Sequence, residues 1–147
     1  MALTLVRAKP QFDVLFARVS ETLLRFQREV VTSGARFLVM IIPDEYQVDA
    51  KLRAAVISRM GRRPSDFDFD RPQRRLRQFL DAHDIEYVDL LEAFQSRGGR
   101  QPLYRLRDTH WNAAGNQLAA EQLLSVWSAG GPEAEIFTKM PSSRSFD

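Results

Sequence analysis

The sequence predicts an α/β fold in which parallel strands lie between flanking helices. Three patterns indicate this fold class: an amphipathic helix pattern after Pro10, an uninterrupted apolar run over residues 37–42, and a second short apolar run over residues 85–90. A strand that is apolar on both faces is typical of a parallel sheet covered by helices on both sides. Because sheets usually hold about four to six strands, two convincing strands predict a partial fold, the second half of a larger α/β domain whose N-terminal half is absent.

The first predicted element is a long helix that follows Pro10. Apolar residues recur along it at spacings of three and four, which places them on one face. They are Phe12, Leu15, Val19, Leu23, Phe26 and Val30. Gly34 is predicted to end this helix in a left-handed conformation. The strand over residues 37–42 ends before Pro43, and residues 44–47 are predicted to form a loop at the carboxyl edge of the sheet, where ligands of α/β folds bind.

Helical and extended segments alternate through the middle of the chain. The predicted elements are a helix over residues 49–60, a polar connection over 61–70, a helix ending near His83, a strand over 85–90 and a short helix over 91–96. Asp70 is expected to cap the second of these helices, in whose first turn Pro72 is tolerated. The order of elements fits the crossover connection that joins parallel strands.

Composition and charge exclude several classes of protein. With 44% hydrophobic and 27% charged residues the chain is globular in character. A net charge of +2 gives no indication of a nucleic-acid partner, and the arginines at 71, 74, 75 and 77 are predicted to form the solvated face of an amphipathic helix. The absence of cysteine excludes disulfides and a thiol nucleophile. No apolar run reaches membrane-spanning length, no secretion signal is recognisable at the start, and the compartment stays open.

Residues 108–115 concentrate the side chains that can carry chemistry. Asp108 and His110 lie two positions apart, so in extended backbone they project to the same side and the carboxylate reaches one imidazole nitrogen. The other nitrogen is then free to act as a base. Asn112 is expected to cap the helix that follows. A metal site needs three or four ligands, and the only other histidine, His83, lies in a helical stretch, so no metal and no cofactor are expected.

Four blocks of the sequence together resemble bacterial SGNH, or GDSL-type, hydrolase-like proteins. They are Ile-Pro-Asp-Glu-Tyr-Gln-Val at 42–48, Asp-Arg-Pro-Gln-Arg-Arg-Leu at 70–76, Tyr-Val-Asp-Leu-Leu at 87–91 and, most specific, Leu-Tyr-Arg-Leu-Arg-Asp-Thr-His-Trp-Asn-Ala-Ala-Gly-Asn at 103–116. The resemblance is to the C-terminal half of the domain and implies a flavodoxin-like three-layer α/β/α fold. It implies that His110 corresponds to the catalytic base and Asp108 to the carboxylate that orients it. One residue separates Asp108 from His110, a spacing that resembles relatives of the alginate acetyltransferases. In the family as a whole, two residues between the Asp and the His are more usual.

The resemblance also implies a nucleophile that this chain lacks. In the family a catalytic serine lies in a Gly-Asp-Ser block, with a Gly and an Asn from later blocks completing the oxyanion hole, and no Gly-Asp-Ser occurs here. None of the serines is predicted to lie on a strand-to-helix turn that faces His110. Since a general base alone contributes about 10²–10⁴-fold to a rate, the isolated chain is expected to be inactive or nearly so.

Three functions stay open on these residues. The first is a serine esterase or carbohydrate O-acyl hydrolase, acting on a small-molecule or carbohydrate ester, of which this chain carries the Asp-His part. The second is an O-acetyltransferase of the alginate-acetylation type, with a serine further downstream and a sugar hydroxyl as acceptor. The third is a non-catalytic binding or assembly module that self-associates through exposed strand edges.

Four further residues are predicted to bind substrate: Trp111, Asn112, Asp44 and Tyr46. An alternative for Trp111 is that it packs under the loop and anchors it. Gly115 stands in the first turn of a helix, where glycine costs stability relative to alanine. A close approach of a neighbouring strand or loop is the expected reason.

The domain is predicted to cover residues 1–128. Residues 129–147 are predicted to form a loose tail, because this last segment has no helical or strand periodicity. Two short segments, residues 2–6 and 135–140, are weaker strand candidates. Either of them would enlarge a sheet that is otherwise small.

Overall fold

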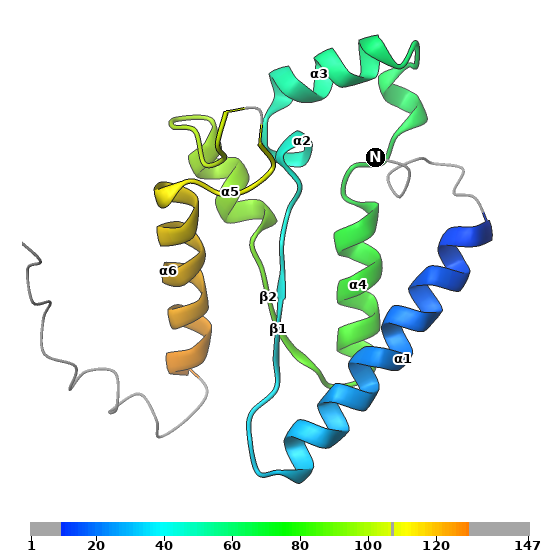
Figure 1. Ribbon diagram of the computed structural model, residues 1–147, viewed down its shortest axis with the longest axis vertical. Coiled ribbons are helices and arrows are strands. Elements are labelled where there is room, and N and C mark those ends of the chain that lie inside the picture. Colours follow the sequence, from blue (N-terminus) through cyan, green and yellow to red (C-terminus); the bar gives the residue numbers. More distant parts are fainter. Residues whose placement is uncertain (1–9, 107, 130–147) are drawn as a thin grey trace, which may run out of the picture.

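A computed structural model describes residues 10–106 and 108–129 (Figure 1). Its helices are α1 (Pro10–Thr32), α2 (Glu45–Val48), α3 (Ala50–Arg59), a 3₁₀ turn (Pro64–Asp66), α4 (Arg71–Ala82), α5 (Leu91–Gly98) and α6 (Ala113–Ala129). Its strands are β1 (Leu38–Ile41) and β2 (Glu86–Asp89). The predicted order of helices and strands is confirmed within these residues. The strand candidates at 2–6 and 135–140, and residues 130–147 of the predicted tail, lie outside the described residues.

β1 and β2 form a parallel pair in which Leu38 lies opposite Glu86 and Ile41 opposite Asp89. Both predicted strands are therefore confirmed, each one residue shorter at either end than the apolar run that predicted it. Parallel pairing requires the chain to cross from the end of β1 back to the start of β2. The segment from α2 to α4 makes this crossing.

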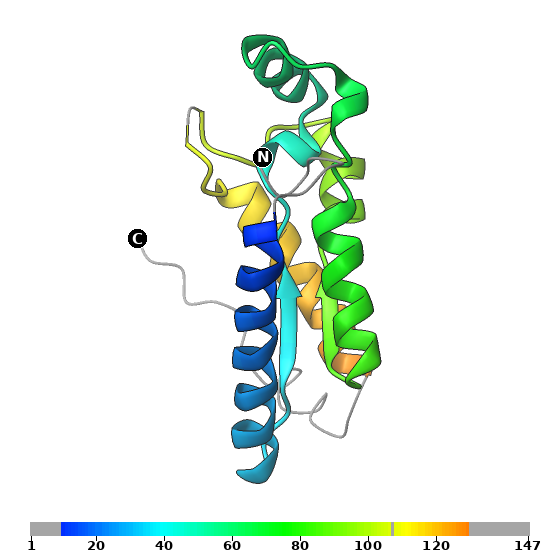
Figure 2. The same ribbon diagram turned by 90° about the vertical axis from the view of Figure 1, so that its right-hand side faces the viewer.

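Helices cover both faces of the sheet. On one face Met40 and Val88 belong to an apolar cluster with Leu118 of α6. On the other face Ile41 clusters with Leu80 of α4 and with side chains of α1. Figures 1 and 2 show α6 on one side of the strands and α1 and α4 on the other. The three-layer α/β/α arrangement of the predicted α/β fold is confirmed.

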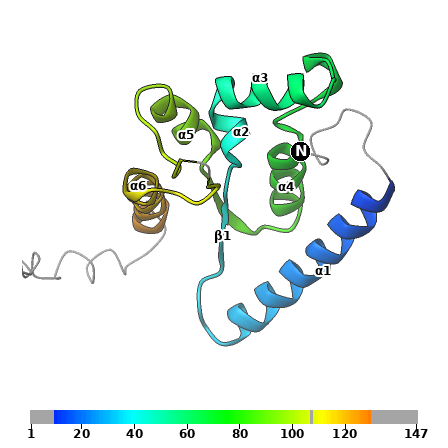
Figure 3. The same ribbon diagram turned by 45° about the horizontal axis from the view of Figure 1, so that its top comes forward.

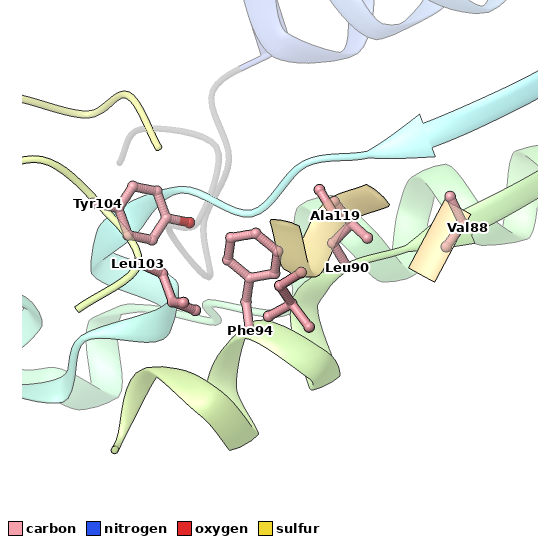
Figure 4. Packing of buried hydrophobic residues seen from close by; sticks show 7 residues of the cluster. Val88, Leu90, Phe94, Leu103, Tyr104 and Ala119 are labelled. Atoms are coloured by element: carbon pink, nitrogen blue, oxygen red, sulfur yellow. The ribbon is translucent and has the colours of Figure 1, made fainter. Parts of the chain in front are cut away.

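The larger of the two apolar clusters in the described residues lies around the carboxyl end of β2. Leu90 and Phe94 have no exposed surface, and Leu103 and Tyr104 of a later loop are 2% and 7% exposed. All four belong to one cluster, which Figure 4 shows between α5, α6 and the loop. Complete burial of an apolar side chain of this size contributes about 1.5–3 kcal/mol. This cluster fixes the loop after α5 against the edge of the sheet.

Two local predictions were wrong. In place of the loop predicted over residues 44–47, Glu45–Val48 form the short helix α2 with Asp44 as its N-cap, because the side chain of Gln47 folds back and its Oε1 accepts the Asp44 backbone N–H at 2.8 Å. Asp70 occupies the cap position of α4, but its side chain makes no capping hydrogen bond. The backbone of Asp70 is already close to helical, with φ −91° and ψ −6°, whereas a capping side chain requires an extended backbone.

The apolar stripe predicted for α1 is only partly buried. The helix and the left-handed Gly34, with φ of 82°, are confirmed. Leu23 packs against the sheet cluster, but Leu15, Val19 and Phe26 stay 51%, 52% and 47% exposed. The stripe is wider than the surface that α4 and the two described strands offer to it.

Ion pairs accompany two of the basic residues of α4. Arg74 pairs with Asp68, and Arg75 pairs with Asp13 of α1 at 2.7 Å while its guanidinium lies 4.0 Å from the centre of the Phe16 ring. The solvated arginine face predicted for this helix is thus partly engaged with acidic partners.

Within the described residues, none of the helices has the length and apolar character needed to cross a membrane.

Candidate active site

The Asp-Thr-His-Trp segment lies in a loop that returns on itself. Tyr104 and Trp111 form an antiparallel bridge, and the backbone N–H of Arg105 donates to the carbonyl of His110 at 2.9 Å. At the tip, the N–H of Asp108 donates to the carbonyl of Arg105 at 3.1 Å. These backbone hydrogen bonds join Arg105 to Asp108 and to His110 across the loop, although the side chains of Asp108 and His110 are 40% and 81% exposed.

Asn112 joins this loop to α6. Its Oδ1 accepts the N–H of Gly115 at 3.0 Å, which is the capping hydrogen bond predicted from the sequence. Its Nδ2 donates to the carbonyl of Pro102 at 2.9 Å and lies 3.4 Å from that of Tyr104. The side chain therefore has partners within the protein on both its oxygen and its nitrogen. Its predicted contact with substrate stays a prediction.

Asp108 and His110 form the hydrogen-bonded pair that the sequence predicts. The distance from Asp108 Oδ1 to His110 Nδ1 is 2.5 Å, and the same oxygen accepts the backbone N–H of His110 at 3.0 Å. The hydrogen bond from the imidazole is the main cause that lowers the pKa of Asp108 below its ordinary value of 3.8. An ionised carboxylate can only accept, so the shared proton resides on Nδ1, and in the neutral imidazole Nε2 is the nitrogen that carries the lone pair.

The imidazole stands at the border of an open pocket of about 400 Å³. The side chain of His110 is 81% exposed. The pocket is lined by His110 with Ile42, Arg105, Thr109, Trp111 and Asn116. It therefore offers a base, a cation, an amide and an aromatic ring around one space.

Among the described residues no group of three histidine, aspartate or glutamate side chains is arranged as a metal site.

Residues 7–140 match the family described as the SGNH hydrolase-like domain of the acetyltransferase AlgX. The chain belongs to this family. The match spans almost the whole chain and confirms the resemblance carried by the four sequence blocks, including its AlgX-related branch. No curated protein and no solved structure matched the chain.

In this AlgX-type domain Trp111 packs on the core, the anchoring role that the sequence offered as one alternative, and its contact with substrate stays a prediction. Its ring packs on Phe94 of the core, with centroids 5.1 Å apart and planes at 41°. The half-buried ring also contributes to the pocket beside His110. Packing on the core restricts the orientation of the ring, and the remaining surface is available to a ligand.

Asp44 and Tyr46 lie at the same edge of the sheet but are not among the described residues that line the pocket beside His110. Asp44 is exposed at the start of α2. The ring of Tyr46 makes an edge contact with Phe69 at 6.1 Å. Their predicted contact with substrate therefore requires a ligand that extends beyond the pocket, and it stays a prediction.

Tyr104 is a site residue that sequence reasoning missed. Its hydroxyl donates to the carbonyl of Pro43 at 2.9 Å and so ties the loop to the end of β1. Burial raises the pKa of Tyr104 to about 12, which keeps the hydroxyl protonated and able to donate. A tyrosine four residues before Asp108 was the available signal, but the sequence alone did not indicate its partner.

Gln47 is the second residue that sequence reasoning missed. It is 3% exposed, and its Nε2 donates to Gln73 Oε1 and to the Phe69 carbonyl, both at 2.7 Å. Gln73, also 3% exposed, donates back to Gln47 Oε1 at 3.0 Å. A buried amide that satisfies its donors and acceptors in this way favours a unique arrangement of its neighbours. The pair fixes α2 against α4 and thereby positions residues 44–46 at the sheet edge.

Glu45 adds negative charge next to the Asp108–His110 pair. Desolvation raises its pKa above the ordinary value of 4.5, and the nearby charges of Asp49, Asp44 and Asp108 raise it further. Because the folded state favours the protonated carboxyl, ionisation of Glu45 opposes folding at neutral pH. This opposition disappears as the pH falls below the ordinary pKa.

Glu45→Gln is therefore expected to stabilise the protein at neutral pH. The melting temperature should rise by about 1–2 °C at pH 7, as expected for a fraction of a kcal/mol in a domain of this size. The difference from the wild type should vanish below about pH 4.5, which thermal unfolding followed by circular dichroism between pH 4 and pH 8 would measure. A stabilisation that persists at pH 4, or a destabilisation at pH 7, would contradict this account.

Proposed function

We propose that this AlgX-type domain takes part in O-acyl transfer, moving an acetyl group from an ester donor to a carbohydrate hydroxyl, with His110 as the general base. The observation that carries the proposal is the Asp108–His110 pair, whose imidazole borders an open pocket. The carboxylate orients the ring and stabilises the imidazolium that forms when the base accepts a proton. Membership in the family named for the acetyltransferase AlgX supports transfer in preference to hydrolysis.

The reaction proceeds in two halves around one serine hydroxyl. His110 Nε2 accepts the serine proton as Oγ bonds to the acyl carbon, the ester C–O bond breaks, and the proton passes from the imidazolium to the leaving alcohol. In the second half the sugar hydroxyl gives its proton to Nε2 as its oxygen bonds to the acyl carbon. The bond from the acyl carbon to Oγ then breaks and the imidazolium returns the proton to serine.

The nucleophilic serine is not among the described residues that line the pocket. In this proposal it comes from elsewhere in the polypeptide or from a partner, and the present chain supplies the base and its orienting carboxylate. Arg105 and Trp111 line the same pocket and are placed to contact the acceptor. Trp111 offers a flat apolar surface to a sugar ring, and Arg105 offers hydrogen-bond donors.

Ester hydrolysis is a second candidate function, in which water takes the place of the sugar hydroxyl. It is favoured by one observation, the 81% exposure of the His110 side chain, which leaves the base open to solvent. The two functions share the first half-reaction. They differ only in the acceptor that enters the second half.

A p-nitrophenyl acetate assay tests the proposal. We expect no turnover above background from residues 1–147 alone, and turnover from the product of the longest open reading frame that includes them. In that longer protein His110→Ala should abolish release of p-nitrophenol. Mass spectrometry of added oligomannuronate, the acceptor suggested by the resemblance to the alginate-acetylating relatives, should show acetylated sugar.

Each alternative outcome is informative. Release of p-nitrophenol without acetylated sugar would favour the hydrolase instead of the transferase. Turnover that survives His110→Ala would remove His110 from the mechanism. Turnover by residues 1–147 that His110→Ala abolishes would mean that this chain contains its own nucleophile.

A further inference from the structure

The side-chain amide of Asn116 has a fixed orientation in the first turns of α6. Its Nδ2 donates to the carbonyl of Asn112 at 3.0 Å, and the same carbonyl accepts the backbone N–H of Asn116 at 3.0 Å. Because a carbonyl oxygen can only accept, the group of Asn116 that faces it must be the NH₂. The amide oxygen Oδ1 therefore lies at the opposite end and is not used in this contact.

Asn112, which anchors this amide, is itself held within the protein. Its side chain bonds the first turn of α6 and donates to the carbonyl of Pro102. Figure 3, in which the carboxyl end of β1 is turned toward the viewer, shows the segment before α6 reaching across to the chain that leaves β1, where Tyr104 is bonded to Pro43. The Asn116 amide is thus attached to a junction that is already ordered, so a ligand that binds it pays little entropy for ordering.

The free oxygen of Asn116 belongs to the pocket beside His110, which Asn116 lines. Within the part of the chain that the structure describes, no group donates a hydrogen bond to Oδ1. Of the other polar side chains around this pocket, those of Arg105 and Trp111 can only donate, and the Thr109 hydroxyl can do either. Oδ1 is therefore an acceptor that does not titrate, and the group of a ligand that satisfies it is a donor such as a hydroxyl.

We propose that Asn116 is a specificity-determining residue of the acceptor site, whose Oδ1 accepts a hydrogen bond from the hydroxyl next to the one that reacts. The inference rests on the acyl-transfer function proposed above. The reacting hydroxyl must reach His110, and both residues line one space of about 400 Å³, a size typical of small-molecule sites. Neighbouring hydroxyls of a pyranose ring lie side by side, so a sugar that gives one to His110 presents the next to Asn116. The site then selects vicinal diols over deoxy sugars and simple alcohols.

A structural role for Asn116, as an extension of the cap of α6, is the alternative. The two roles use different ends of the same amide. The structural role depends on Nδ2 and its bond to Asn112, whereas recognition depends on Oδ1. Only recognition predicts that the effect of removing the amide depends on which hydroxyls the ligand carries.

Titration of residues 1–147 with methyl β-D-mannopyranoside, followed in nitrogen–proton NMR spectra, tests recognition without turnover. The sugar should shift the backbone amides around the pocket and the side-chain NH₂ of Asn116, because a hydrogen bond to Oδ1 polarises the amide. The monodeoxy analogue that lacks the recognised hydroxyl should bind about threefold to tenfold more weakly. This analogue should leave the NH₂ resonances of Asn116 unshifted.

Asn116→Leu is the decisive variant, since leucine is similar in size and suits a helix. It should weaken binding of the parent sugar by about the same factor and should not weaken binding of that one analogue further, a non-additive pair of losses that marks direct contact. In the longer protein it should raise KM for the acceptor sugar more than it lowers kcat. Gln117→Leu is the matched control, because Gln117 is an exposed amide of α6 that bonds Glu121 and does not line the pocket. The control should bind every sugar as the wild type does.

Two results would overturn the proposal: losses that simply add for every monodeoxy analogue, and NH₂ resonances of Asn116 that the parent sugar leaves unmoved at its solubility limit. If Asn116→Leu fails to fold, these wild-type resonances decide. Failure of the proposed function gives a different result. Transfer that does not depend on His110 would remove that function, whereas His110-dependent transfer with an unchanged KM in Asn116→Leu would remove only the role of Asn116.

Discussion

Replacing Asp108 with asparagine is expected to lower kcat for acyl transfer by about 10³–10⁴-fold in the form of the protein that supplies the nucleophile. The amide is nearly isosteric with the carboxylate, so the position of the imidazole should change little. An asparagine NH₂ placed toward Nδ1 donates where Asp108 Oδ1 now accepts at 2.5 Å. The imidazole proton then moves to Nε2, and the nitrogen that borders the pocket can no longer accept a proton.

The same substitution has a readout that does not depend on turnover. In residues 1–147 the nitrogen chemical shifts of His110 should indicate the Nδ1–H tautomer, and in Asp108→Asn the Nε2–H tautomer. Glu92→Gln is the matched control, because it removes an exposed carboxylate of α5 that does not line the pocket, and its kcat should stay within about threefold of the wild type. An Asp108→Asn enzyme that keeps a tenth or more of the wild-type rate would remove the orienting role of Asp108. Since the pair is exposed, the melting temperature should not change.

Gly115→Ala is expected to give the largest loss of stability among single-methyl additions. A Cβ at this position would collide with the backbone carbonyl of Leu103 and would lie 3.0 Å from Trp111 Cβ. The Leu103 carbonyl already accepts the N–H of Asn112 at 3.0 Å, so it cannot retreat without breaking the loop. Overpacking against backbone costs about 1–3 kcal/mol, more than the roughly 1 kcal/mol that alanine adds to a helix.

The melting temperature of Gly115→Ala should therefore fall by several degrees, about 2–4 °C for each kcal/mol lost. Gly99→Ala is the matched control, since a Cβ there meets no atom within 4 Å and its φ of −68° suits alanine. That control should be neutral or slightly stabilising. Equal melting temperatures for the two variants would show that α6 and the loop separate easily, contrary to the packing described here. The short distance between Gly115 and the Leu103 carbonyl confirms the predicted close approach of a neighbouring loop.

Much of the framework was readable from periodicity. The apolar run at 37–42 predicted a strand covered on both faces, and β1 has apolar clusters on each side. Gly34 predicted a left-handed helix end, and Asn112 predicted a cap; both are confirmed. These predictions succeeded because each depends on residues that lie close together in the sequence.

Predictions failed where a distant residue decides the local conformation. Nothing in the order Asp44-Glu45-Tyr46-Gln47 reveals that Gln47 is held by Gln73 of another helix, and this buried pair makes a helix of the predicted loop. Tyr104 was likewise missed because its partner, the carbonyl of Pro43, lies 61 residues away. The exposure of Leu15 was missed because periodicity shows which residues share a face but not how wide the covering surface is.

The sequence by itself determined the α/β class, the pairing of Asp108 with His110 and the family, because these depend on spacing along the chain. Only the tertiary structure decided where that pair stands: on a loop fastened to the end of β1 by Tyr104 and to α6 by Asn112, with the imidazole turned toward an open pocket. The physical reason is that an exposed loop has too few local interactions to fix itself. Its position is set by a buried core assembled from α5, α6 and the end of β2, segments that meet only after the chain has folded.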